Sequence, residues 1–204
     1  MSDIDRLYTK HQEAFETYLK ELLLWNEQFN LTAIRTPEEI KVKHFFDSLT
    51  LLPFIPKGVK TLVDVGSGAG FPGIPLAIVR PDLLVTLVES VGKKTTFLEH
   101  IVTTLGLKNV EVIYARAEEV ATHPDYFESF DVGVARAVAK LDKLAGFVLP
   151  LIKKHGIFLA QKGTLENIAE SENEVTVHSG KIISTETITE KDLKDRIVVI
   201  IKKT

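Results

Sequence analysis

The feature that most constrains the fold is a glycine-rich segment that follows a short apolar run. The run is Thr61-Leu62-Val63, and its aliphatic and β-branched residues predict a buried strand. The segment at 64–73 reads Asp-Val-Gly-Ser-Gly-Ala-Gly-Phe-Pro-Gly, and the apolar stretch at 74–79 predicts a helix. A strand, a glycine-rich turn and a helix together hold nucleotide-like ligands at the carboxyl ends of strands in doubly wound α/β proteins.

Two kinds of ligand fit this turn. Gly68-x-Gly70-x-x-Gly73 matches the dinucleotide fingerprint, in which backbone N–H groups hold a pyrophosphate. Pro72 and Pro75, however, remove two N–H groups at that turn, and Asp64 places a negative charge beside it. These features favour a cationic ligand without phosphate, such as S-adenosylmethionine. The predicted cofactor contacts in this segment are Asp64, Gly66, Ser67, Gly68 and Gly70.

A second strand is predicted at 83–89, and it ends in an acid. Glu89 lies about twenty residues beyond the glycines, where a carboxylate accepts hydrogen bonds from both ribose hydroxyls of either cofactor. The alternative is a solvated charge at the end of a strand.

Composition limits the class of protein. With 204 residues, of which 45% are hydrophobic, we expect one sizeable domain with a small appendage. The chain has no cysteine, which excludes disulfides and thiolate metal sites, and its six histidines lack zinc spacing, so we expect no metal. We see no signal peptide or membrane span and expect a cytoplasmic protein. A net charge of −3 means that any nucleic acid must be held by a local patch, which counts mildly against an RNA substrate.

The chain divides into a helical extension at 1–57 and a sheet domain at 58–204. A possible capping box at Ser2 and Asp5 begins a helix whose apolar residues recur every three or four positions as far as Phe29. A second helix is predicted from Thr36 to Leu52, with a proline at its first position. Because this part contains no predicted strand, we expect it to pack on the sheet domain as a lid.

From residue 61 onward, predicted strands alternate with helices, which indicates a parallel sheet. Further strands are expected at 110–114, 130–135 and 156–160. Helices are expected from Ser90, as the cap, to Leu105, over 141–152 and over 164–171. Segments 176–188 and 197–201 are expected to close the sheet as an antiparallel pair.

Several motifs carry a resemblance to a known family. They are Asn30-Leu31-Thr32-Ala33-Ile34, Lys43-His44-Phe45-x-Asp47-Ser48-Leu49, the segment 64–75, Val88-Glu89-Ser90-x-x-Lys93-Lys94, Arg116-Ala117-Glu118, Ala135-Arg136-Ala137 and Gln161-Lys162-Gly163. In these motifs, which span 30–163 in order, the chain resembles the RsmG family, formerly called glucose-inhibited division protein B, of bacterial 16S rRNA guanine-N7 methyltransferases. The family often reads Ala-Lys-Gly where this chain has Gln161 before Lys162.

The resemblance implies an α/β fold with the Rossmann-like sheet of class I methyltransferases, mostly parallel with an antiparallel last strand, and S-adenosylmethionine as cofactor. By the same resemblance, Gly66 and Phe71 line the methionine moiety and Glu89 the ribose. Ala117 and Glu118 would line the adenine, although an acid here is also favourable in the first turn of a helix. Arg136 would lie beside the cofactor at the mouth of the substrate site.

The implied reaction needs no general base, because guanine N7 already carries a lone pair. Orientation of the reacting atoms would supply most of the catalysis. Arg136 would grip a phosphate or a base edge, and we interpret His44 and Asp47 as a structural tether from the front helices to the site. Candidates for the RNA backbone are Lys93, Lys94, Arg35 and Lys162, although each is more often a solvated charge. The expected partner is 16S rRNA, within a small-subunit particle, and the expected state is a monomer.

Two other functions stay open at this point. A nicotinamide-dependent oxidoreductase would use the same kind of sheet, although the two prolines oppose pyrophosphate binding. A non-catalytic module that only binds S-adenosylmethionine would share the turn and Glu89 without transferring a methyl group.

Overall fold

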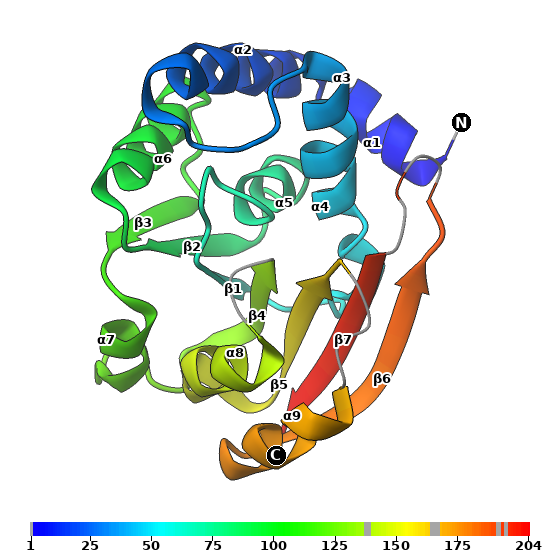
Figure 1. Cartoon of the computed structure of the whole chain (residues 1–204), viewed down its shortest axis with the longest axis vertical. Helices are drawn as coiled ribbons and strands as arrows, with labels where there is room; N and C mark the ends of the chain where they lie inside the picture. The colour runs from blue at the N-terminus through cyan, green and yellow to red at the C-terminus, as the bar shows by residue number, and fades with distance from the viewer. Residues whose placement is uncertain (1, 137–139, 164–167, 191–192, 194–195) are drawn as a thin grey trace.

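The described residues of the computed structural model form a seven-stranded sheet with helices on both faces (Figure 1). They are 2–136, 140–163, 168–190, 193 and 196–204. The strands are β1 (Thr61–Val65), β2 (Leu84–Glu89), β3 (Val110–Tyr114), β4 (Phe130–Arg136), β5 (Ile152–Lys162), β6 (Gly180–Ile188) and β7 (Arg196–Lys203), in the order β3-β2-β1-β4-β5-β7-β6. The pairs from β3 to β5 are parallel, whereas β7 is antiparallel to both β5 and β6. The predicted fold class is confirmed.

Each face of the sheet buries its own core. In β1, Leu62 packs with the front helices while its neighbour Val63 packs on the opposite face, as the two-residue period of a strand requires. On the first face lie α5 (Gly73–Val79) and α6 (Gly92–Thr104), together with the front helices. On the other face lie α7 (Ala117–Thr122), α8 (Leu141–Val148) and α9 (Ile168–Val177).

The front of the chain forms two helices where one continuous apolar face was predicted. The capping box is confirmed, since Asp5 N–H donates to Ser2 Oγ and Asp5 Oδ2 accepts from Ser2 N–H. The helix ends at α1 (Asp3–Lys10), and α2 (Gln12–Phe29) begins after a break at His11. Both helices share one hydrophobic core with the first face of the sheet. The division at residue 57 and the action of this part as a lid stay predictions.

The second front helix begins where the sequence predicts but is not a uniform α-helix. Thr36 caps α3 (Pro37–Ile40), which continues as a π-helical segment, Lys41–Phe46, and then as α4 (Asp47–Leu49). A separate 3-10 turn, Leu52–Phe54, follows. Single π turns within helices are frequent at functional sites, and this one carries His44.

Other predicted boundaries are wrong or shifted. Ser90 does not cap α6, because Val91 occupies the N-cap position and Glu89 binds the backbone there. The predicted helix at 141–152 ends as a 3-10 turn, Leu149–Leu151, and β5 begins at Ile152. Residues 176–177 belong to α9, so β6 begins only at Gly180. Of the helix predicted at 164–171, residues 164–167 lie outside the described residues.

The strand order determines where a ligand fits. β1 lies between β2 and β4, and the chain leaves β1 and β4 toward opposite flanks of the sheet. Such a reversal leaves a crevice beyond the carboxyl ends of the strands, which is where open α/β sheets bind ligands. The glycine turn follows the carboxyl end of β1, between the ends of β2 and β4 (Figure 1).

Candidate functional site

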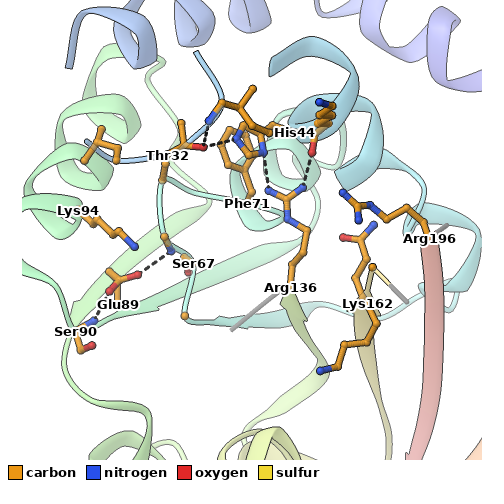
Figure 2. Close-up of a pocket in the computed structure, with 18 residues that line it drawn as sticks. Thr32, His44, Ser67, Phe71, Glu89, Ser90, Lys94, Arg136, Lys162 and Arg196 are labelled. Carbon is orange, nitrogen blue, oxygen red and sulfur yellow. Dashed lines mark hydrogen bonds between the residues drawn. The ribbon is translucent and has the colours of Figure 1, made fainter. Parts of the chain in front are cut away.

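A pocket of about 540 Å³ lies at the carboxyl ends of β1, β2, β4 and β5 (Figure 2). Its walls come from the glycine turn, the four strand ends and the front helices. The lining residues are Leu31, Thr32, Ile34, Lys43, His44, Gly66, Ser67, Gly68, Ala69, Phe71, Glu89, Ser90, Lys94, Arg136, Gln161, Lys162, Gly163 and Arg196.

The glycine turn has the backbone conformation that its sequence predicts. Gly66, Gly68 and Gly70 all have positive φ, which L side chains rarely adopt. A Cβ at Gly68 would meet only Gly66 O, at 3.9 Å, so the chain leaves open space beside this residue. Gly68 lines the pocket, so a ligand there can approach its bare backbone.

Glu89 connects the turn to the start of α6. Its Oε2 accepts the Gly68 N–H at 2.8 Å, and its Oε1 accepts the N–H groups of Ser90 and Val91 at 2.9 and 2.8 Å. The side chain is nearly buried yet lines the pocket. A carboxylate has about four lone-pair sites, so these three bonds leave one acceptor site, on Oε2, for a ligand hydroxyl.

Asp64 was predicted to contact the cofactor, but its environment in the structure is different. It is fully buried beneath the turn and is not among the residues that line the pocket. Its Oδ2 accepts the Gly73 N–H at 2.8 Å at the start of α5, while its Oδ1 has no hydrogen-bond partner among the described residues. Burial raises the pKa of this carboxyl to about 7. The structure therefore places Asp64 under the turn, as a cap of α5.

The start of α5 offers little to a pyrophosphate. The Gly73 N–H is taken by Asp64, and the Ile74 N–H donates to Gly70 O at 2.9 Å. Pro72 and Pro75 have no N–H at all. The backbone donors that hold phosphate at other helix starts are thus used or missing here.

Phe71 forms part of an aromatic stack that supports the pocket wall. Its ring stacks on His44 at 4.3 Å between centroids and on Tyr18 at 5.3 Å. The Tyr18 hydroxyl donates to Ala69 O, so α2 contacts the glycine turn directly. The guanidinium of Arg136 lies 5.1 Å from the centre of the Phe71 ring.

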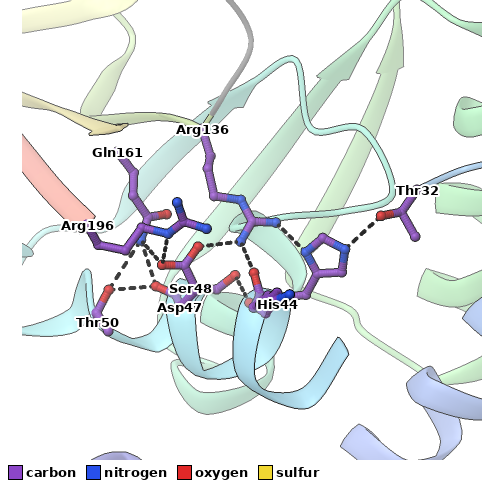
Figure 3. Close-up of polar contacts among 9 residues, drawn as sticks. Thr32, His44, Asp47, Ser48, Thr50, Arg136, Gln161 and Arg196 are labelled. Atoms are coloured by element: carbon purple, nitrogen blue, oxygen red, sulfur yellow. Dashed lines mark hydrogen bonds and ion pairs between the residues drawn. The ribbon is translucent and has the colours of Figure 1, made fainter. Parts of the chain in front are cut away.

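Arg136, at the end of β4, is held by the helix that carries His44 (Figure 3). Its Nη1 donates to Asp47 Oδ2 at 2.9 Å and to Lys43 O at 3.2 Å, and its Nη2 donates to His44 Nδ1 at 3.1 Å. Only 12% of the Arg136 side chain is exposed. Because three of its five N–H donors are engaged inside the protein, the structure presents Arg136 as a wall of the pocket with two N–H groups left for a ligand.

His44 is held as a neutral imidazole. Arginine can only donate, so His44 Nδ1 is the acceptor and Nε2 carries the hydrogen that is donated to Thr32 Oγ1 at 2.9 Å. Burial, followed by the charge of Arg136, lowers the pKa of His44 to about 3. The tether that the sequence suggested is confirmed in these contacts.

Asp47 is the centre of the polar network in Figure 3. The carboxylate is fully buried, and besides Arg136 it accepts from Arg196 Nε at 3.1 Å and from Gln161 Nε2 at 3.0 Å, both at Oδ1. Gln161 Nε2 also donates to Asp47 O at 2.7 Å and to Thr50 Oγ1 at 3.2 Å. Two arginines and one amide thus compensate a buried negative charge.

The predicted site residues divide into two groups. Those that the structure places in the pocket lining are Gly66, Ser67, Gly68, Phe71, Glu89, Lys94, Arg136 and Lys162. Those that lie outside the lining are Asp64, Gly70, Ala117, Glu118, Lys93 and Arg35. Ala117 and Glu118 begin α7, as the alternative interpretation holds, and their contact with adenine stays a prediction.

Arg196 was not predicted as a site residue, and neither were the contacts of Thr32 and Gln161. Arg196 lies 149 residues from Asp47 in the sequence, and only the antiparallel β7 brings it to the pocket. Local patterns cannot reveal such a pair. The departure from the family motif at Gln161 was the one available signal.

Within the described ranges, no helix is long and apolar enough to cross a membrane. The same part of the chain holds no group of three or more histidine, cysteine or acidic side chains arranged to bind a metal ion.

Solved structures with the same fold include methyltransferases. The chain is similar to M. jannaschii TYW2, solved in complex with AdoMet, with a TM-score of 0.60 and 20% identity over 78% of this chain and 74% of that one. It is also similar to a SAM-dependent methyltransferase from Aquifex aeolicus, with a TM-score of 0.63 and 18% identity over 81% and 93% of the two chains. At these identities the likeness shows the fold alone.

Sequence comparison shows the family. The model of GidB, rRNA small subunit methyltransferase G, matches residues 11–198. Ribosomal RNA small subunit methyltransferase G of Roseiflexus sp. (strain RS-1) is 44% identical, over 97% of this chain and 86% of the relative. The protein of the same name from Lactobacillus helveticus (strain DPC 4571) is also 44% identical, over 97% and 85%. The chain therefore belongs to the GidB family of rRNA small subunit methyltransferases.

Proposed function

We propose that this protein transfers the methyl group of S-adenosylmethionine to N7 of a guanosine in 16S rRNA. The observation that carries the proposal is a single pocket with two unlike halves, in a chain of this family. One half combines the glycine turn with Glu89, and the other combines cationic side chains with Gln161, held from behind by the buried Asp47.

The first half suits S-adenosylmethionine, which supplies an electrophilic methyl group on a sulfonium. Glu89 would accept the ribose hydroxyls, and the bare backbone from Gly66 to Gly68 would lie along the methionine moiety. The open space beside Gly68 and the engaged N–H groups at the start of α5 fit a ligand without phosphate. The family and these contacts do not favour a nicotinamide-dependent oxidoreductase.

The second half suits a nucleotide. Arg136, Arg196 and Lys162 line it. Asp47 compensates one of these charges, and the positive charge that remains favours a phosphate near the pocket mouth. Guanine N7 attacks with its own lone pair, and the neutral His44 is already bonded on both nitrogens. The protein would act by orienting the base and excluding water, without a general base.

Lys94 and Lys43 line the pocket, whereas Lys93 and Arg35 lie on the exposed surface around it. These few cations give a short contact with the RNA backbone, and the net charge of −3 opposes a longer one. We therefore propose a small-subunit particle as the substrate, since its shape and proteins add contacts. A cytoplasmic monomer is the corresponding proposed state.

The test is methyl transfer from tritiated S-adenosylmethionine to naked 16S rRNA, partly assembled small subunits and mature small subunits, with identification of the product nucleoside. We expect 7-methylguanosine, at the highest rate on a particle. Another methylated nucleoside would contradict the target atom. Cofactor binding without transfer to any of the three would instead support a non-catalytic binding module, and NADH binding in place of S-adenosylhomocysteine would support the oxidoreductase.

A further inference from the structure

Gln161 carries a buried acceptor atom that the described part of the chain leaves without a hydrogen-bond partner. The side chain belongs to a residue that is only 1% exposed, and its Oε1 has no hydrogen bond among the described residues. Unsatisfied polar atoms of this kind are rare in native structures and cost free energy, so each one calls for an explanation. Gln161 also lines the pocket, where a ligand can supply the missing donor.

The orientation of the Gln161 amide is determined by its neighbours. Nε2 donates to Asp47 O, Asp47 Oδ1 and Thr50 Oγ1, and the Thr50 hydroxyl hydrogen is itself donated to Asp47 O at 2.6 Å. Turning the amide over would place Oε1 against a carbonyl and a carboxylate, neither of which can donate. Oε1 is therefore the atom left to a ligand, and Figure 3 shows the nitrogen on the side of Asp47 and Thr50.

The groups beside this acceptor are donors. Gln161 is the register partner of Arg136 in the neighbouring strand, and Arg196 meets the same Asp47 carboxylate from β7. A base that fits between them must present an acceptor to a guanidinium and a donor to Oε1. Guanine does so with O6 and its 2-amino group, whereas adenine presents a 6-amino donor and no 2-amino group.

We propose that Gln161 selects guanine by accepting a hydrogen bond at Oε1 from the 2-amino group of the target base. The proposal rests on the proposed function, since it assumes that the base to be methylated enters this half of the pocket. It assigns a specificity role to the residue at which this chain departs from the family motif.

The experiment removes the 2-amino group from the substrate. Small-subunit particles are reconstituted with guanosine or inosine at the position that the wild-type enzyme methylates, and kcat/KM is measured on both. One neutral hydrogen bond predicts that wild type prefers guanosine roughly tenfold. Gln161→Met, of similar length without hydrogen-bonding groups, should methylate the two substrates at equal rates. Thr50→Val removes one acceptor of Nε2, leaves Oε1 in place and should keep the preference.

Melting temperature and S-adenosylhomocysteine affinity show whether each variant is folded. If Gln161→Met does not fold, Gln161→Asn withdraws the same oxygen by one methylene and is expected to lose the preference. The inference would be overturned if the ratio of kcat/KM on the guanosine substrate to that on the inosine substrate were near one for wild type. It would also be overturned if the Gln161 variant kept the wild-type ratio, or if Thr50→Val lost it. Absence of 7-methylguanosine on every particle would overturn the proposed function instead.

Discussion

At Glu89, one carboxylate joins two turns that follow different strands. It accepts N–H groups from Gly68 after β1 and from Ser90 and Val91 after β2. Its position was predictable because an acid at the end of a second strand is a local pattern. Its bonds to the backbone were not, since they depend on how the two strands pair.

The open space beside Gly68 leads to a prediction with a matched control. Gly68 and Gly106 both have φ +62, and Gly106, after α6, has no atom within 4 Å of an added Cβ. A valine strains both positions alike, by roughly 1–2 kcal/mol. We expect Gly68→Val to abolish the rise in melting temperature caused by S-adenosylhomocysteine and Gly106→Val to retain it. A normal rise with Gly68→Val would refute the placement of the cofactor at this turn.

The raised pKa of the Asp64 carboxyl predicts that the stability of the protein depends on pH. Its pKa is about 7 in the folded protein and about 3.9 in an unfolded chain, so the folded state binds the extra proton between these values. Its contribution to the free energy of unfolding is full below about pH 4 and is lost as the pH rises to about 7. His44, whose pKa is lowered, contributes in the opposite direction.

The free energy of unfolding is therefore compared between wild type and Asp64→Asn, because the contribution of His44 is the same in both proteins and cancels in the difference. The free energy of unfolding of wild type minus that of Asp64→Asn should fall by a few kcal/mol between about pH 4 and 7 and then stay constant. A difference that is flat over this range would show that Asp64 is ionised throughout.

At the scale of elements, the strands were predictable and the helix irregularities were not. Most strands contain an apolar run bounded by turn residues, and that signal is local, whereas β6 alternates apolar and polar residues and its start was misplaced. His11 stands in line with the apolar face of the first helix, so periodicity alone runs through the break between α1 and α2. The π turn at Lys41–Phe46 adds one residue to a helical turn without a distinctive composition.

The contact between α2 and the glycine turn predicts an effect of the front helices on cofactor binding. Tyr18→Phe removes the donor to Ala69 O and should lower the free energy of unfolding by about 1 kcal/mol and weaken S-adenosylhomocysteine binding severalfold. Tyr8→Phe is the control, because it removes a hydroxyl that bonds only to Glu16 within the front helices. Equal cofactor affinity of the two variants in calorimetry would contradict a role for α2 at the turn.

At the scale of the whole molecule, one core joins the front helices to the sheet. Trp25, the single tryptophan, lies on α2 and packs against His100 of α6 at 5.0 Å between ring centroids. Its fluorescence therefore reports the junction of the two parts. We expect thermal unfolding followed by Trp25 fluorescence and by far-ultraviolet circular dichroism to coincide. A fluorescence transition at a lower temperature would show that the front helices unfold as a separate unit.

The sheet order, the glycine turn and the cationic wall together place cofactor and substrate in one pocket. A crystal structure of the protein with S-adenosylhomocysteine tests this arrangement most directly. We predict the ribose hydroxyls on Glu89, the amino acid moiety along Gly66–Gly68, and the sulfur facing the half of the pocket formed by Arg136 and Gln161. A ligand bound elsewhere, or one whose sulfur faces away from Arg136, would contradict the account.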